Sequence, residues 1–398
     1  MDGMATFPGG PEGFDPEAFA DTPLFREIQR VLSSSSGPVN WELARQVGIA
    51  GAQEGGADPA PSDEDRRASE EAARVAELQV ARLTGLEPPS DVPAVRPVRR
   101  AEWVTAAIES LGEVIEPAAA RAGRAMEQVA QAGADDLPEE AAAFTGGAML
   151  AQLSPLLMGA QVGSVLGYLG RRAFGQFDVP VPRGGAASLL FVTATIEGFA
   201  HDWSLDPTEF RTAVALHEVA HRFEFGRSWA PGRFRELLDD FVSTLQLDVQ
   251  ALREKIEHLD AADPEAMQQL MEGEEGLFGA VLDGEQRIKL ARIQSFMAAS
   301  EGWADHVASA IGAELLPSHG KIEEAVRRHR EADATDPVFE RLLGVEMKRE
   351  RYLAGRVFAD RVAELTDETT LARMWQDADS MPSAPEIDEP RLWLARIV

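Results

Sequence analysis

Residues 212–226 read TAVALHEVAHRFEFG. Two of the chain's seven histidines, His217 and His221, stand four positions apart here, and Glu218 follows the first of them. On a helix, residues four apart lie on the same face, one turn from each other. Two imidazoles in that arrangement can bind one zinc ion, and the glutamate beside the first can take a proton from a zinc-bound water. The stretch therefore predicts a zinc site with His217 and His221 as ligands and Glu218 as general base.

The residues just before this motif favour the start of a helix. Asp206 is a typical N-cap, and Pro207 is a typical first helical residue. Glu209 stands where a capping box places its carboxylate. We therefore expect a helix over about 207–226 that carries the motif.

A catalytic zinc site needs a third protein ligand and one open coordination position. A third histidine six residues after His221 would suit this role, but that position is Arg227. The later stretch SFMAASEGWADHVASAIG has Glu301 among apolar residues and Asp305 one turn further on the same face. An unpaired carboxylate in such surroundings would be costly. We predict Glu301 as the third ligand and Asp305 as the hydrogen-bond partner of a ligand histidine.

Amide hydrolysis also needs a donor for the oxyanion that forms at the carbonyl group. Tyr352, one of only two tyrosines, is one candidate on a predicted late helix, although a tyrosine there can equally serve core packing. His306 is a second candidate, but it points about 100° away from Asp305 around the helix. Both assignments stay open at this point.

Charge and composition exclude several classes of protein. The chain has 38 basic and 67 acidic residues, a net charge of -29, which argues against nucleic acid or an anionic membrane surface as a partner. It has no cysteine, so a metal must be held by His, Asp or Glu. The acidic N-terminal residues lack the basic flank and apolar segment of a signal peptide. We therefore expect a cytoplasmic protein.

Residues 141–170 carry no charge, yet they are a poor membrane span because Gln, Ser, Pro and six glycines interrupt them. We expect a buried pair of helices there. A stripe of small residues would let a neighbouring backbone approach closely: Gly159, Gly163, Gly167 and Gly170.

The remaining pattern predicts a mainly α protein with a small β element before the metal-binding helix. Residues 1–21 read as a disordered acidic tail, and 22–398 as one domain that contains an acidic linker over 52–70 and a metal-site core over about 180–365. GQFDVPVP and SLLFVTATI are the stretches that favour strands. The second is a candidate edge strand for an extended substrate, and it could equally be a buried hydrophobic strand. Further helices are expected over about 231–257, 264–272, 285–312, 320–331, 337–363 and 368–377.

Several motifs together resemble the actinobacterial zincin-like metallopeptidase family, formerly a domain of unknown function, some of whose members are associated with coenzyme F420 biosynthesis. The resemblance covers the chain from about residue 22 to its end, on these stretches: PLFREIQR, GPVNWELARQ, GAQVGSVLGYLGRRAFGQFDVPVP, VALHEVAHRFEF, EGWADHV, GVEMKRERYLAGRVF and RLWLARIV. It implies one mostly helical catalytic unit with zincin-like geometry. It also implies that zinc is held by His217, His221 and Glu301, with Glu218 as base.

The sequence thus predicts a zinc-dependent metallohydrolase, a metallopeptidase of gluzincin type, which hydrolyses amide bonds with a glutamate-activated water. The expected partner is a peptide or a small amide. Two alternatives stay open: a non-catalytic zinc-binding scaffold protein, and a hydrolase of a small-molecule amide in cofactor metabolism related to coenzyme F420.

Overall fold

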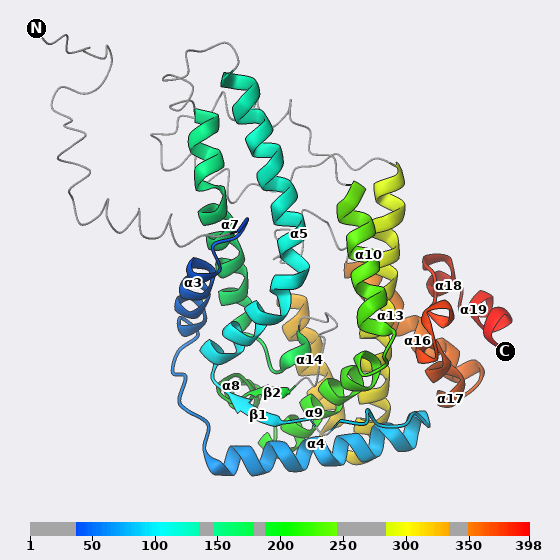
Figure 1. The fold of residues 1–398 in the computed structure, drawn as a ribbon. Coiled ribbons are helices and arrows are strands. Elements are labelled where there is room, and N and C mark those ends of the chain that lie inside the picture. The colour runs from blue at the N-terminus through cyan, green and yellow to red at the C-terminus, as the bar shows by residue number, and fades with distance from the viewer. Residues whose placement is uncertain (1–36, 92, 135–145, 179–187, 245–283, 334–348) are drawn as a thin grey trace, which may run out of the picture.

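The computed structural model describes residues 37–91, 93–134, 146–178, 188–244, 284–333 and 349–398. Within these ranges the chain is mainly helical, with one small parallel sheet, as the sequence predicts (Figure 1). The predicted tail over 1–21 and the predicted helix over 264–272 lie outside the described residues.

The elements follow one another in this order: α3 (Trp41–Gln53), α4 (Asp63–Thr84), β1 (Val95–Val98), α5 (Arg100–Ala134), α7 (Gly146–Gly170), β2 (Leu189–Val192), α8 (Thr193–Asp202), α9 (Pro207–Phe225), α10 (Ala230–Thr244), α13 (Gly284–Leu315), α14 (His319–Asp333), α16 (Arg349–Leu365), α17 (Glu368–Leu371), α18 (Ala384–Asp388) and α19 (Pro390–Ile397). A short 3-10 helix covers Gln176–Asp178, and two more cover Ala372–Trp375 and Ala378–Ser380.

The glycine stripe of α7 is the surface on which α3 packs. A Cβ added at Gly163 would lie 2.6 Å from the carbonyl oxygen of Ala44, and one at Gly159 would collide with the carbonyl of Asn40. The predicted close backbone approach is therefore confirmed. The predicted helical pair is wrong for the described part of 141–170, because one helix continues through Pro155. No helix in the described ranges is long and apolar enough to cross a bilayer.

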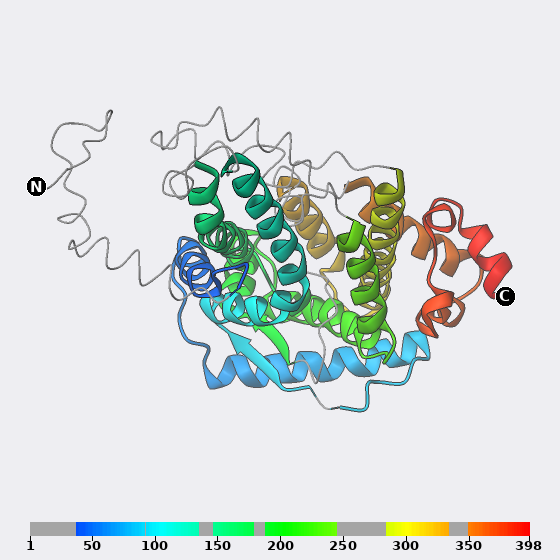
Figure 2. The same ribbon diagram turned by 45° about the horizontal axis from the view of Figure 1, so that its top comes forward.

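Helix α4 lies along α9, which carries the histidine motif (Figures 1 and 2). The buried Arg222 of α9 donates a 3.0 Å hydrogen bond to Glu77 of α4 and another to the carbonyl of Asp91. Helix α4 begins after Ser62, which forms a capping box with Asp65. The predicted linker over 52–70 is therefore too long: acidic residues at its end form the first turns of a helix.

The sheet is smaller than the sequence suggests. Strand β2 pairs in parallel with β1, with Val95 opposite Leu189, and all four of its residues are buried. The chain turns directly into α8 at Thr193, so only the first part of SLLFVTATI is a strand. On its other side β2 bridges Gly175 in antiparallel orientation. All four residues of β2 are buried and its second side makes one bridge, at Phe191, so the structure favours a buried strand over an edge strand for substrate. Strand β1 was not predicted from the sequence because it contains Pro97, a residue that argues against a strand.

Helix α9 begins as predicted, but one contact differs. Asp206 accepts hydrogen bonds from the backbone amides of Thr208 and Glu209. The Glu209 carboxylate, instead of closing a capping box, accepts hydrogen bonds from the amide (2.8 Å) and hydroxyl (2.5 Å) of Ser318. The start of the metal-binding helix is thereby tied to the start of α14.

Helix α13 crosses α9 and packs closely on α16. A Cβ at Gly302 would collide with the backbone of Gly355, and one at Gly355 would collide with the carbonyl of Ala298. Gly302 is the residue directly after Glu301. The close contact of α13 with α16 therefore fixes the position from which the Glu301 side chain reaches α9.

We predict opposite effects for the same substitution at two helical glycines. Gly163→Ala should lower the free energy of unfolding by about 1–3 kcal/mol, because the new methyl group meets the backbone of α3. Gly198→Ala in α8, where the methyl group meets no atom within 4 Å, should raise it by about 0.5–1 kcal/mol. Urea unfolding of both variants measures this, and equal effects would contradict the packing described here.

Candidate metal centre

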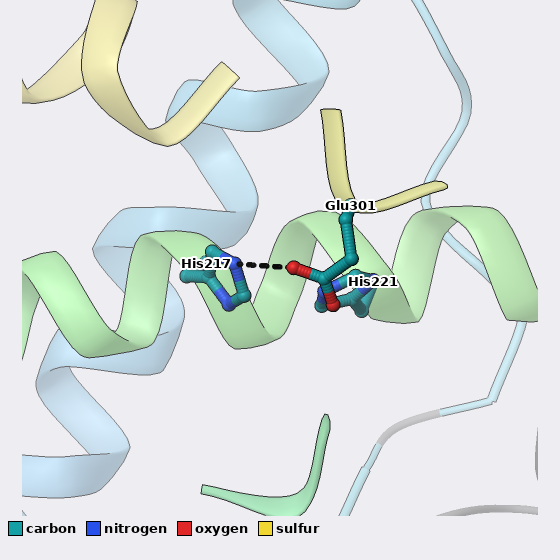
Figure 3. Close-up of side chains that lie close together, drawn as sticks. All are labelled: His217, His221 and Glu301. Atoms are coloured by element: carbon teal, nitrogen blue, oxygen red, sulfur yellow. Dashed lines mark ion pairs between the residues drawn. The ribbon is translucent and has the colours of Figure 1, made fainter. Parts of the chain in front are cut away.

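The three predicted ligands come together where α9 crosses α13 (Figure 3). His217 Nε2 lies 3.8 Å from one carboxylate oxygen of Glu301, and His221 Nε2 lies 3.4 Å from the other. All three ligand atoms fall within 4.8 Å of one another. Across the described ranges, no other group of three such side chains meets this condition.

The donor set fits a zinc ion. Two imidazole nitrogens and one carboxylate oxygen are the protein ligands of many catalytic zinc sites, which keep a further position open. His221 Nε2 is fully buried and makes no hydrogen bond, since its 3.4 Å approach to Glu301 is poorly aligned. A buried imidazole nitrogen without a partner is costly unless something binds it, and a metal ion would do so.

The other face of His221 is held by a residue that the sequence reasoning missed. Glu224, three positions later on α9 and completely buried, lies 3.0 Å from His221 Nδ1. Ser300 of α13 donates a 2.5 Å hydrogen bond to the same carboxylate oxygen of Glu224. With Nδ1 engaged, Nε2 is the nitrogen left to face Glu301. A glutamate at that helical spacing in an otherwise apolar stretch was the signal that could have identified it.

The predicted base, Glu218, is buried against residues 175–177, which lie between α7 and β2 in the chain. Its carboxylate accepts a 2.9 Å hydrogen bond from the backbone amide of Phe177. Any side chain larger than hydrogen at Gly175 would collide with that carboxylate. Burial and the negative charge of Asp178 raise the pKa of Glu218 to about 7, against the opposing positive charge of His217. Such a carboxyl group can accept and release a proton near neutral pH.

Asp305 contacts His217 at Nε2. A carboxylate that only supports a ligand histidine would instead bind the ring nitrogen that does not face the metal, here Nδ1. One carboxylate oxygen of Asp305 lies 3.2 Å from His217 Nε2, the nitrogen that also faces Glu301. Its other oxygen accepts a 2.7 Å hydrogen bond from Arg330 of α14. Burial alone would raise the pKa of Asp305, but its negative form is stabilised by the positive charge of Arg330, and the pKa lies far below its ordinary value. Arg330 was also missed, since no spacing links α14 to the motif.

Of the two candidate oxyanion donors, the structure describes the side chain of His306. It turns away from the centre: Nδ1 lies 2.6 Å from Asp360 of α16, and Nε2 lies 2.9 Å from Glu368 of α17. Both nitrogens are occupied, which leaves His306 no donor for a substrate oxyanion and corrects that prediction. Tyr352 belongs to α16, but its side chain lies outside the described part of the structure.

Comparison with known proteins supports this interpretation of the site. The model of a family of zincin-like metallopeptidases matches residues 39–394. A crystal structure of a hydrolase candidate with a novel fold, from Chloroflexus aurantiacus, is 27% identical with a TM-score of 0.62; the match covers 90% of this chain and 98% of that one. No curated protein matches. Neither match mentions coenzyme F420 or an actinobacterial source, so both stay predictions.

We predict that Glu224→Gln weakens zinc binding by about 10- to 100-fold, because an amide holds the His221 imidazole less firmly than a carboxylate. Competition against a chromophoric chelator measures the change. Glu236→Gln, on the exposed face of α10, is the matched control and should bind zinc like the wild type. Equal affinity of both variants would argue against a supporting role for Glu224.

A pH-dependent stability is expected from His306. Burial alone would lower its pKa, but the hydrogen bonds to Asp360 and Glu368 raise it from 6.5 to about 9. Because the folded state binds the proton more tightly, the stabilisation is complete below about pH 6.5 and is lost as pH rises through about 9.

The wild type should therefore exceed a His306→Gln variant by about 1–3 kcal/mol in free energy of unfolding at pH 6, and the difference should shrink by pH 10. Denaturant unfolding at several pH values measures this. His201→Gln alters an exposed imidazole of α8 and serves as control. A difference that stays constant from pH 6 to 10 would rule out a protonated His306 as its source.

Proposed function

We propose a zinc-dependent amide hydrolase from one premise: the chain belongs to the zincin-like metallopeptidase family. The observation that carries the proposal is the meeting of His217, His221 and Glu301 from two crossing helices, with the buried carboxylate of Glu218 beside them. This arrangement is of the gluzincin type, in which a glutamate on a later helix completes the ligand set.

Each side chain then has a defined task. His217, His221 and Glu301 would hold the zinc ion, which when bound supplies Lewis acidity and lowers the pKa of a nearby water. Glu218 accepts the proton of the attacking water and passes it to the leaving amine. Its hydrogen bond from the Phe177 amide keeps the carboxylate in place between those two transfers.

The substrate class in this proposal is an amide, either of a peptide or of a small molecule. An extended peptide was favoured by one expected feature, a free strand edge in SLLFVTATI. In the structure, however, all four residues of β2 are buried, and Phe191 bridges Gly175 on the side away from β1. The small-molecule alternative therefore stands beside the peptide in any substrate screen.

Metal content tests the ligand assignment. The purified protein should hold close to one zinc per chain, and His217→Ala and Glu301→Ala should both lose it, whereas His201→Ala should keep it. Zinc lost in the first variant but kept in the second would mean that Glu301 is not a ligand. A wild type that takes up no zinc would favour the scaffold alternative over an enzyme.

Glu218→Gln tests the base. It should keep a full equivalent of zinc but lower turnover by about 10²- to 10⁴-fold, because glutamine cannot accept the proton of the water. Turnover is measured on N-blocked peptides and amino-acid amides hydrolysed by the wild type. Wild-type turnover by a fully zinc-loaded Glu218→Gln protein would show that another group is the base.

A further inference from the structure

Helix α14 is fixed over the metal centre at both ends. Near its start, Ser318 is bound to Glu209 of α9. Near its end, the ring of His329 packs against Phe174 and Phe199, with ring centroids 5.5 and 5.1 Å apart. The next residue, Arg330, is therefore presented to the centre by a packed helix.

Asp305 orients the guanidinium of Arg330. One nitrogen, Nη1, donates to Asp305 at 2.7 Å, while Nη2 lies 3.4 Å from His217 Nε2. A planar guanidinium bound by a carboxylate on one side directs its remaining N–H groups along fixed lines. Here Nη2 faces His217 Nε2, the same nitrogen that faces Glu301, so it lies beside the atoms that would hold the zinc ion and the substrate carbonyl.

The contact between Arg330 and His217 cannot persist once Nε2 binds a metal ion, because the nitrogen has one lone pair to give. The hydrogens of Nη2 are then available to another acceptor in the same space. About half of the Arg330 side chain is exposed (49%), so an incoming molecule can reach it. Its permanent positive charge suits an anionic oxygen.

We propose that Arg330, oriented by Asp305, is the donor that hydrogen-bonds the oxyanion formed at the substrate carbonyl. This rests on the proposed hydrolase function. Water adds its oxygen to the carbonyl carbon and gives one proton to Glu218, while an electron pair of the C=O bond moves to the carbonyl oxygen. Arg330 donates an N–H hydrogen bond to that oxyanion without transferring a proton. In this assignment Asp305 is a positioning residue for Arg330 rather than a support for His217 alone.

The test uses two ligands on the zinc-loaded, full-length protein: phenylphosphonate, a tetrahedral anion, and imidazole, a neutral metal ligand. The variants are Arg330→Gln, Arg330→Lys and the matched control Arg328→Gln, an exposed arginine of α14 that pairs with Glu324. Zinc content is measured for each protein, and calorimetry gives both dissociation constants.

Arg330→Gln should keep its zinc and its affinity for imidazole but bind phenylphosphonate at least about tenfold more weakly. Arg330→Lys should fall between it and the wild type, and Arg328→Gln should match the wild type. On a substrate that the wild type hydrolyses, Arg330→Gln should lower kcat by about 10²- to 10³-fold with little change in KM.

Unchanged phenylphosphonate affinity in Arg330→Gln would overturn this inference and leave the hydrolase proposal intact. An equal loss of both ligands would also overturn it, since Arg330 would then shape the site rather than bind the anion. A zinc-loaded wild type that binds neither ligand would instead refute an open catalytic zinc, and with it the proposed function.

Discussion

The central interaction of this structure is the meeting of two imidazoles on α9 with a carboxylate on α13. It places ionisable groups where water is largely excluded, and burying them is costly unless each finds a partner. Glu301 faces both histidines, Glu224 holds the far side of His221, and Asp305 faces His217. Of the histidine nitrogens at this crossing, the buried Nε2 of His221 makes no hydrogen bond, and it lies at the position where a metal ion would bind.

The surrounding fold makes that crossing possible by backbone contact rather than by side-chain bulk. On one side, Gly302 and Gly355 let α13 and α16 touch. On the other, Gly175 makes room for the carboxylate of Glu218, while the same short segment extends the sheet beside β2. A methyl group at any of these three positions would displace the elements that carry Glu301 or cover the base. The segment that bridges β2 at Gly175 thus helps to place Glu218.

The centre also has two layers with different tasks. Glu224 and Ser300 are fully buried and act on His221 from behind. Asp305 and Arg330 pair with each other and are partly exposed to solvent. A buried hydrogen-bonded carboxylate gives rigidity to a ligand. A half-exposed guanidinium can exchange one hydrogen-bond acceptor for another, as a group that donates a hydrogen bond to a transient oxyanion must.

The sequence by itself predicted the mainly helical class, the start of α9 and the glycine surface of α7, because each of these follows from local spacing on a helix. It nominated His217, Glu218 and His221 from their spacing, and Glu301 from its apolar surroundings and a family resemblance. It also implied a role for Asp305, one turn from Glu301. Tertiary structure alone decided the rest. Glu224, Arg330 and the cover of Glu218 depend on which helices meet. So do the contacts of His306 with Asp360 and Glu368, which turn this candidate oxyanion donor away from the centre. Spacing fixes which side chains share a face, whereas only the packing of one face on another fixes what they touch.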